Sequence, residues 1–161
     1  MQTDKKSSLI QLNQQQLSFI EKNGLHLEQS CGVPRISGRI VGLLMVLSRP
    51  ITIAEICKTL HVSHGSVSTN LRLITMMSLA KKVTLTGVRF DYYQFSSQGW
   101  VEIIKQKMAN AQSLQNLASE TIEALEPSGI VKTRFEEMVI WSSIVDQKYN
   151  EILEEWRNRN V

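Results

Sequence analysis

The order of apolar and polar positions predicts a chain of helices that is interrupted once by strands. From residue 8 to residue 30, apolar residues recur at mostly three-to-five-residue steps, which predicts a first helix. Gly32 suits a helix C-cap, and Pro34 disfavours helix in the residue before it, so this helix ends there. Pro34 then begins a second helix over residues 34–48. Gly38 and Gly42 lie four residues apart in that helix and would let a neighbouring backbone approach closely.

Two short helices are predicted next. Thr52 and Glu55 form a capping-box pattern, with a hydroxyl at the N-cap and a carboxylate three residues later. The apolar residues of 53–60 then follow the spacing of one buried helical stripe. A turn at 61–63 leads into a second helix over 64–77. The inner face of this second helix is expected to carry Val67, Leu71 and Ile74. Two short helices joined by a three-residue turn are typical of a helix-turn-helix.

Beyond residue 80 the period changes from 3.6 to about 2, which predicts strands. Val83 and Leu85 alternate with polar residues, Gly87 marks a turn, and residues 89–95 are rich in aromatics. Together they predict a β-hairpin, and a helix-turn-helix followed by a hairpin is the winged-helix order. The core of the hairpin is expected to contain Tyr92, Tyr93 and Phe95.

The remaining chain is predicted to form two long helices, over residues 97–126 and 130–157. Two interleaved seven-residue series run along the last helix, which is the pattern of a helix packed along a partner helix. The first series is Val131, Met138, Val145 and Ile152, and the second is Phe135, Ser142, Tyr149 and Trp156. The partner is a helix of the same chain, a helix of a second copy, or both.

These elements predict a mostly α fold with a small β-hairpin wing, a winged helix-turn-helix with long N- and C-terminal dimerisation helices. We expect residues 1–33 to form a scaffold helix and residues 34–95 a DNA-binding module. Residues 96–161 would supply dimerisation and an effector region.

Composition is that of an ordinary globular protein, because 42% of the 161 residues are apolar and 20% are charged. This excludes a wholly disordered chain and a disulfide-stapled miniprotein. The longest apolar run is only residues 43–47, too short to span a bilayer. Lys5 and Lys6 have no apolar segment behind them, so no secretion signal is expected. With only two cysteines, the sequence predicts a cytoplasmic protein.

The net charge of +3 is unevenly distributed. Residues 1–33 are neutral, residues 34–95 carry eight bases and two acids, and residues 96–161 carry seven bases and ten acids. The middle segment therefore has a net charge of +6, which favours an anionic partner such as DNA. The alternative is a solvated surface that happens to be basic.

Three motifs resemble those of the GbsR-type transcriptional regulators, a branch related to the MarR regulators. They are GVPRISGRIVG at residues 32–42, VSHGSVSTNLR at 62–72 and RFDYY at 89–93. The resemblance covers about 64 residues, and the flanking helices match only in length and placement. It implies a homodimeric winged-helix repressor or activator that binds palindromic double-stranded operator DNA. Some members of the family respond to choline-like compounds.

The predicted second helix of the helix-turn-helix has a small, polar and basic outer face. Small residues let a helix enter the major groove, and arginine forms a bidentate pair with guanine. Its first turn carries no acid, which suits a phosphate oxygen. The predicted DNA-binding residues here are Ser63, His64, Gly65, Ser66, Ser68, Thr69 and Arg72. The alternative is an ordinary surface helix, although such helices usually carry Glu–Lys pairs.

Further basic residues are predicted to contact DNA from the wing and from residues 34–48. Lys81, Lys82 and Arg89 flank the hairpin turn and would reach the backbone or the minor groove. Asp91 lies two residues from Arg89 and could hold it in an ion pair. Arg35 and Arg39 share one helix face and would either contact phosphates or pair with acids such as Glu28.

Aromatic residues offer an effector pocket, since aromatic faces attract quaternary ammonium groups. The predicted effector-binding residues are Phe19, Trp100, Trp141 and Tyr149. The alternative for these residues is plain core packing.

We expect no cofactor, no metal and no enzymatic activity. Cys57, His61 and His64 form a C-x3-H-x2-H series, but the turn separates the two histidines. Cys31 is expected to be an inert thiol rather than a redox switch. No nucleophile–base–acid order and no phosphate-binding glycine loop is present. The rival functions are a winged helix that only binds proteins and a metal-dependent sensor.

Overall fold

The computed structural model describes residues 10–84 and 90–159, which divide into two compact units. The first unit contains the described residues up to Gly99, and the second contains those from Trp100 onwards. The first is a winged helix-turn-helix with a three-stranded antiparallel sheet, and the second is helical. The predicted fold class, mostly α with a small β wing, is confirmed.

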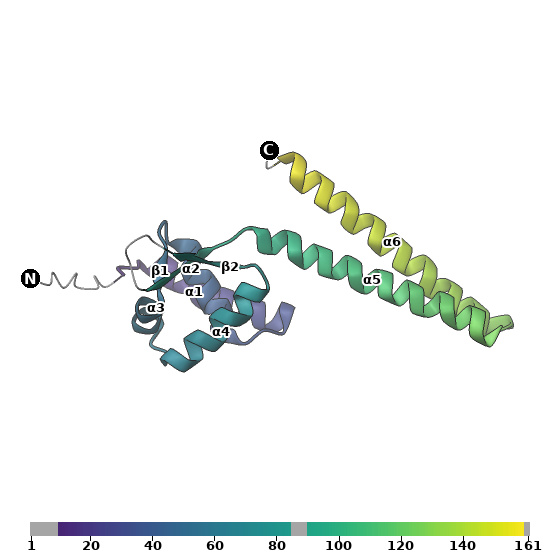
Figure 1. Ribbon diagram of the computed structural model, residues 1–161, viewed down its shortest axis with the longest axis horizontal. Coiled ribbons are helices and arrows are strands. Elements are labelled where there is room, and N and C mark those ends of the chain that lie inside the picture. The colour runs from purple at the N-terminus through teal and green to yellow at the C-terminus, as the bar shows by residue number, and fades with distance from the viewer. Residues whose placement is uncertain (1–9, 85–89, 160–161) are drawn as a thin grey trace, which may run out of the picture. The chain divides into compact units, whose positions relative to one another are not determined.

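The first unit follows the predicted order of elements, with one added strand (Figure 1). Its elements are α1 (Gln14–Cys31), α2 (Arg35–Val46), β1 (Ile51–Thr52), α3 (Ile53–Leu60), α4 (His64–Met76), β2 (Ala80–Thr84) and β3 (Asp91–Phe95). The helix predicted from residue 8 begins only at Gln14, because Asn13 and Gln16 form a reciprocal capping box. Residues 8 and 9 lie outside the described part of the chain.

The sheet has the strand order β1-β3-β2, so the predicted hairpin strands have a third neighbour. Ile51 is opposite Tyr93 in β1 and β3, and Ala80 is opposite Phe95 in β2 and β3. Tyr93 and Phe95 are half-buried. The turn predicted at Gly87 lies outside the described residues.

Glycines set the distance between α1 and α2. A Cβ atom on Gly38 would lie 2.8 Å from the carbonyl oxygen of Asn23 and 2.8 Å from the Cα atom of Gly24. The amide Nδ2 of Asn23 donates a hydrogen bond of 2.7 Å to the carbonyl oxygen of Gly38. A Cβ atom on Gly42 would lie 3.1 Å from the Cα atom of Ile20. The close backbone approach predicted at Gly38 and Gly42 is therefore confirmed, and α1 is the helix that makes it.

The core of the first unit is built around α2, which contacts α1, α3, α4 and β3. Ile40 and Leu43 of α2 are completely buried. The predicted inner face of α4 is buried as well, and so are two residues of the predicted stripe of α3, whose other members Ile53 and Cys57 are half-buried. The buried side chains are Val67, Leu71 and Ile74 of α4 and Ile56 and Leu60 of α3. The helix-turn-helix therefore rests on α2.

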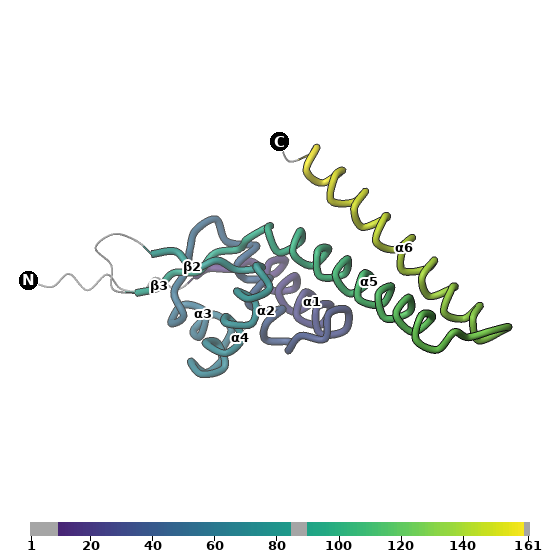
Figure 2. The backbone as a smooth tube through the Cα atoms, turned by 45° about the vertical axis from the view of Figure 1, so that its right-hand side comes forward, coloured from purple at the N-terminus to yellow at the C-terminus, as the bar shows by residue number. Residues whose placement is uncertain are grey.

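The second unit consists of α5 (Gln98–Leu125, which begins two residues inside the first unit) and α6 (Gly129–Arg159). The two helices run in opposite directions and are joined by residues 126–128 (Figures 1 and 2). Ala111 and Ala118 of α5 and Ser142 and Leu153 of α6 are buried. Ser142 belongs to the predicted second seven-residue series, and Phe135 and Tyr149 of that series are half-buried. Trp156, the last member of this series, is 39% exposed, and which helix packs along the series stays a prediction.

A second apolar stripe of α6 is exposed. It consists of Ile130, Trp141, Ile144 and Ile152, whose exposed fractions are between 47% and 66%. Among the described residues, no helix is both long and apolar enough to cross a membrane.

The helix crossing predicts a large difference between two glycine-to-alanine substitutions. Gly38→Ala should lower the free energy of unfolding by about 1–3 kcal/mol, because the added methyl group meets backbone atoms that side-chain rotation cannot move. Gly65→Ala is the control, since a Cβ atom there has no heavy atom within 4 Å, and it should raise stability by up to about 1 kcal/mol. Urea unfolding of both variants measures the difference. Equal effects would show that the α1–α2 contact tolerates a side chain.

Candidate nucleic-acid interface

The turn between α3 and α4 fixes how the second helix begins. His61 ends α3 in the left-handed conformation, with φ 54°, and its backbone N–H donates to the carbonyl oxygen of Cys57. The hydroxyl of Ser63 then accepts a hydrogen bond of 3.3 Å from the backbone N–H of Ser66. Ser63 is therefore the N-cap of α4, as predicted.

The outer face of α4 is composed as the sequence predicts. His64, Gly65, Thr69 and Arg72 are exposed, while Ser66 and Ser68 are half-buried beside them. Arg72 forms no ion pair with any residue in the described part of the chain. None of the described residues therefore neutralises its guanidinium group.

The N-terminal end of α4 is electrostatically open. Its first turn contains no acidic residue, so the partial positive charge of the helix end is not neutralised there. Gly65 adds no side chain that would cover the backbone N–H groups. This end of the helix suits an anionic oxygen such as that of a phosphate.

The wing carries Lys81 and Lys82 as exposed residues of β2. The ammonium nitrogen Nζ of Lys82 lies 2.8 Å from a carboxylate oxygen of Asp91. The hydrogen bond to this carboxylate, with its charge, raises the pKa of Lys82. From the sequence, we expected that Asp91 could form an ion pair with Arg89. In the structure Asp91 pairs with Lys82, and Arg89 lies outside the described residues.

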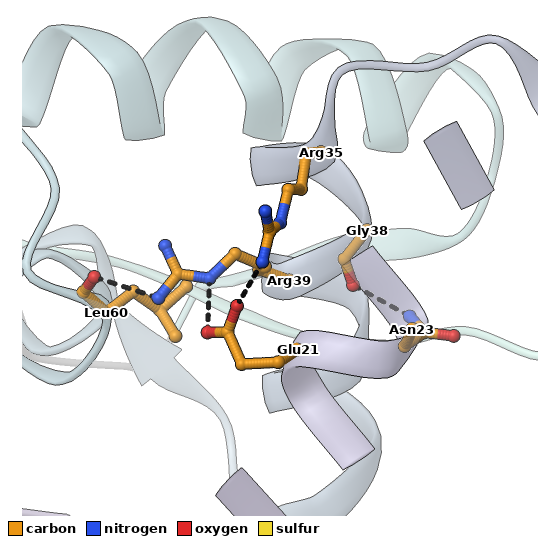
Figure 3. Close-up of polar contacts among 6 residues, drawn as sticks. All are labelled: Glu21, Asn23, Arg35, Gly38, Arg39 and Leu60. Atoms are coloured by element: carbon orange, nitrogen blue, oxygen red, sulfur yellow. Dashed lines mark hydrogen bonds and ion pairs between the residues drawn. The ribbon is translucent and has the colours of Figure 1, made fainter. Parts of the chain in front are cut away.

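Arg35 and Arg39 both pair with Glu21 of α1 rather than with Glu28 (Figure 3). The nitrogen–oxygen distances are 3.0 Å for Arg35 and 2.7 Å for Arg39. Arg39 also donates a hydrogen bond of 3.2 Å to the carbonyl oxygen of Leu60, at the end of α3. Arg39 of α2 thus links α1 to the end of α3. Contact of Arg35 or Arg39 with a DNA phosphate stays a prediction.

Sequence reasoning missed two polar residues beneath the outer face of α4. Asn70 is buried on the inner face of α4, and the hydroxyl of Ser37 in α2 donates a hydrogen bond of 2.7 Å to its Oδ1 atom. The available signal was that Asn70 stands three residues after Val67, in a position of the inner stripe that an apolar residue would ordinarily fill.

Thr52, Arg49 and Glu55 hold the start of the helix-turn-helix. The hydroxyl of Thr52 accepts from the backbone N–H of Glu55, whose carboxylate accepts from the backbone N–H of Thr52 and from Arg49. Burial opposes ionisation of this carboxylate, but the hydrogen bonds from Arg49 and Thr52 outweigh it. The pKa of Glu55 is consequently lowered.

The predicted effector residues belong to three helices in the two units. Phe19 is on α1 in the first unit and lines a surface groove of about 520 Å³ with Gln14, Gln15, Ser18 and Lys22. In α6, Trp141 is exposed, whereas Tyr149 is half-buried. Trp100 lies at the start of α5, and the joint pocket stays a prediction.

A second groove, of about 470 Å³, lies between α5 and α6. It is lined by Ser119, Ile122, Glu123, Glu136, Val139 and Ile140 and so includes none of the predicted aromatics. Within the described residues, no group of three His, Cys, Asp or Glu side chains could hold a metal ion.

Comparison with known proteins supports the winged-helix fold and a similarity to HTH-type transcriptional regulators. No family model matches the chain. The HTH-type transcriptional regulator MmpR5 of Mycobacterium tuberculosis is 26% identical over 110 residues, which are 68% of this chain and 66% of that protein, just under two thirds. YvaV of Bacillus subtilis, a candidate HTH-type transcriptional regulator, is 25% identical over 162 aligned positions, covering 93% of this chain and 82% of that protein.

Among solved structures, one described as a transcriptional regulator has a TM-score of 0.71 and 21% identity to this chain. The match covers 89% of this chain and 99% of that one. This likeness establishes that the two share a fold. The chain is thus a winged helix-turn-helix protein that is similar in sequence to HTH-type transcriptional regulators.

The lowered pKa of Glu55 predicts a pH-dependent contribution to stability. Because the folded-state pKa lies below the ordinary value of 4.5, the ionised carboxylate stabilises the fold above that pH, and the contribution is lost as the pH falls through the folded-state pKa. Glu55→Gln should therefore cost up to about 1 kcal/mol at pH 7 and progressively less in acid. Urea unfolding between pH 7 and pH 3 measures this.

Glu28→Gln is the control for this pH series, because Glu28 is exposed and forms no ion pair within the described residues. It should leave stability nearly unchanged at every pH. A penalty for Glu55→Gln that stays constant from pH 7 to pH 3 would contradict the role of the Glu55 charge.

Proposed function

We propose that this chain is a sequence-specific DNA-binding regulator of transcription. The observation that carries the proposal is the outer face of α4, which combines an acid-free N-terminus with exposed Gly65, Thr69 and Arg72. A helix with small side chains fits the major groove, and an exposed arginine has the donor geometry for the O6 and N7 atoms of guanine. The names of the two similar proteins, both HTH-type transcriptional regulators, support the same function. They describe no enzyme.

The basic surface around α4 would supply sequence-independent affinity. Lys81 is exposed and unpaired among the described residues, and Lys82 is exposed although it pairs with Asp91. With Arg89, these wing residues would bind the DNA backbone or minor groove. Arg35 and Arg39 would contribute a smaller share, because Glu21 already neutralises part of their charge.

We infer that the protein acts as a homodimer. The exposed stripe of Ile130, Trp141, Ile144 and Ile152 lies on a different side of α6 from the buried Ser142 and Leu153, so this apolar surface lacks a partner among the described residues of its unit. Apolar surface of this extent is typical of a protein–protein interface. A two-fold dimer would place two α4 helices on a palindromic operator, with half-sites about 34 Å apart.

We further propose that the protein belongs to the GbsR-type branch of the MarR-related regulators. It would act in the cytoplasm as a repressor that responds to a small molecule. It rests on the three sequence motifs. Phe19, Trp100, Trp141 and Tyr149 are the proposed effector-binding residues, suited to a quaternary ammonium group. A change in the spacing of the two α4 helices would then release the operator.

A different function for the same fold is a module that binds only proteins. Arg72, which is unpaired among the residues the structure describes, and the acid-free start of α4 favour DNA over this alternative. Binding to duplex DNA that weakens with salt separates the two functions, because counterion release is a property of nucleic-acid complexes.

Arg72→Ala should weaken operator binding by about 1–3 kcal/mol per half-site and relax the base preference at one position, since a bidentate base contact is lost. Selection from a random duplex library, followed by titration of single-base variants, measures both effects. Lys105→Ala removes the same charge from the exposed side of α5, where Lys105 pairs with Glu102, and should change neither. Unchanged affinity and unchanged preference for Arg72→Ala would refute its assignment.

Ile144→Asp should shift the protein from dimer to monomer at micromolar concentration, because it places a charge in the centre of the exposed apolar stripe. Ser143→Asp adds the same charge to an exposed neighbour that lies about 160° around the helix from Trp141, and it should stay dimeric. Sedimentation of the full chain measures both. A monomeric wild-type protein would contradict the dimer.

A further inference from the structure

A buried pair of polar side chains connects α2 to the helix that is proposed to read DNA. Ser37 of α2 is 0% exposed and Asn70 of α4 is 8% exposed. The Ser37 hydroxyl lies 2.7 Å from Oδ1 of Asn70, and Nδ2 of Asn70 lies 2.8 Å from the carbonyl oxygen of Ser66, one turn earlier in α4. Both ends of the Asn70 amide are thus engaged.

The chemistry of these groups allows only one arrangement of donors and acceptors. The carbonyl oxygen of Ser66 accepts and cannot donate, so the NH₂ end of Asn70 must face it. The oxygen Oδ1 must then face Ser37, whose hydroxyl is the donor. The pair therefore has a direction as well as a distance.

This arrangement opposes movement of α4 on α2. Apolar contacts such as those of Val67 and Leu71 tolerate small slides and rotations, because dispersion attraction has no preferred direction. If α4 rotated or slid, the hydroxyl of Ser37 and the amide of Asn70 would be left buried without partners, at a cost that apolar neighbours do not impose. Single buried polar residues fix helix register in this way in coiled coils.

The opposite face of α4 carries Thr69 and Arg72, one residue before and two residues after Asn70. Rotation of the helix about its axis would move both side chains relative to a base pair. We propose that Ser37 and Asn70 are positioning residues for DNA reading: they hold the rotation and register of α4, so they determine base selectivity without contacting DNA. This inference rests on the proposed function.

The test separates register from stability by replacing the pair with apolar residues. Ser37→Ala alone leaves Oδ1 of Asn70 buried without a donor and should lower both stability and selectivity. Ser37→Ala combined with Asn70→Leu removes both polar groups, so stability should recover relative to Ser37→Ala while selectivity stays low. Ile74→Val is the matched control, since it trims a buried apolar side chain from the same face of α4.

Selectivity is measured on the full-length protein as the ratio of dissociation constants for a random duplex and for the operator selected by the wild type. The double variant should lose about tenfold or more of this ratio, comparable to one misplaced base contact per half-site. Ile74→Val should keep the wild-type ratio at temperatures where it is folded. Thermal unfolding of each variant supplies the stability scale.

The possible failures are distinguishable. A wild-type protein that selects no sequence from the library overturns the proposed function, and this inference with it. A selective wild type together with a folded double variant that keeps the full ratio overturns only the positioning role. If the double variant does not fold, the ratio for Ser37→Ala decides, and an unchanged ratio there overturns the role as well.

Discussion

The contact between the backbones of α1 and α2 is the constraint on which the first unit depends. A Cβ atom on Gly38 would lie 2.8 Å from backbone atoms of Asn23 and Gly24, and one on Gly24 would lie 2.7 Å from Cγ of Arg39, so larger residues at these positions would push the two helices or their side chains apart. This closeness brings Glu21 within reach of Arg35 and Arg39, and Asn23 within reach of the Gly38 carbonyl group. Because α2 also supports α3, α4 and β3, its placement against α1 determines where the proposed DNA-reading helix lies.

Polar links add direction to this packing. Arg39 joins Glu21 on α1 to the last carbonyl group of α3, and Ser37, two residues earlier in α2, hydrogen-bonds to Asn70 of α4. Among the described residues, no buried side-chain nitrogen or oxygen lacks a hydrogen-bond partner. The first unit therefore combines a tightly packed apolar interior with a few fully satisfied polar contacts, an arrangement that favours one orientation of α4 over its neighbours.

Local signals allowed most of the fold to be predicted, and the errors have local causes. Thr52 and Ser63 were identified as N-caps because capping depends on residues within one turn. The start of α1 was placed too early, since upstream apolar residues extend the helical period past the Asn13 cap. Strand β1 was missed because two residues carry no alternation. Glu21 as the arginine partner and Asn70 as a buried group depend on how α1, α2 and α4 cross, which no single segment encodes.

The unequal burial of the two units has a consequence for synthesis of the protein on the ribosome. The residues up to Gly99 contain nearly all of the large buried side chains, and α2 finds each of its neighbours within that segment. This part of the chain emerges before the second unit and has the contacts it needs to fold while the helices of that unit are still being made. The exposed stripe of α6 is synthesised after this segment, so its apolar side chains reach solution only when the residues of the first unit already have their folding contacts.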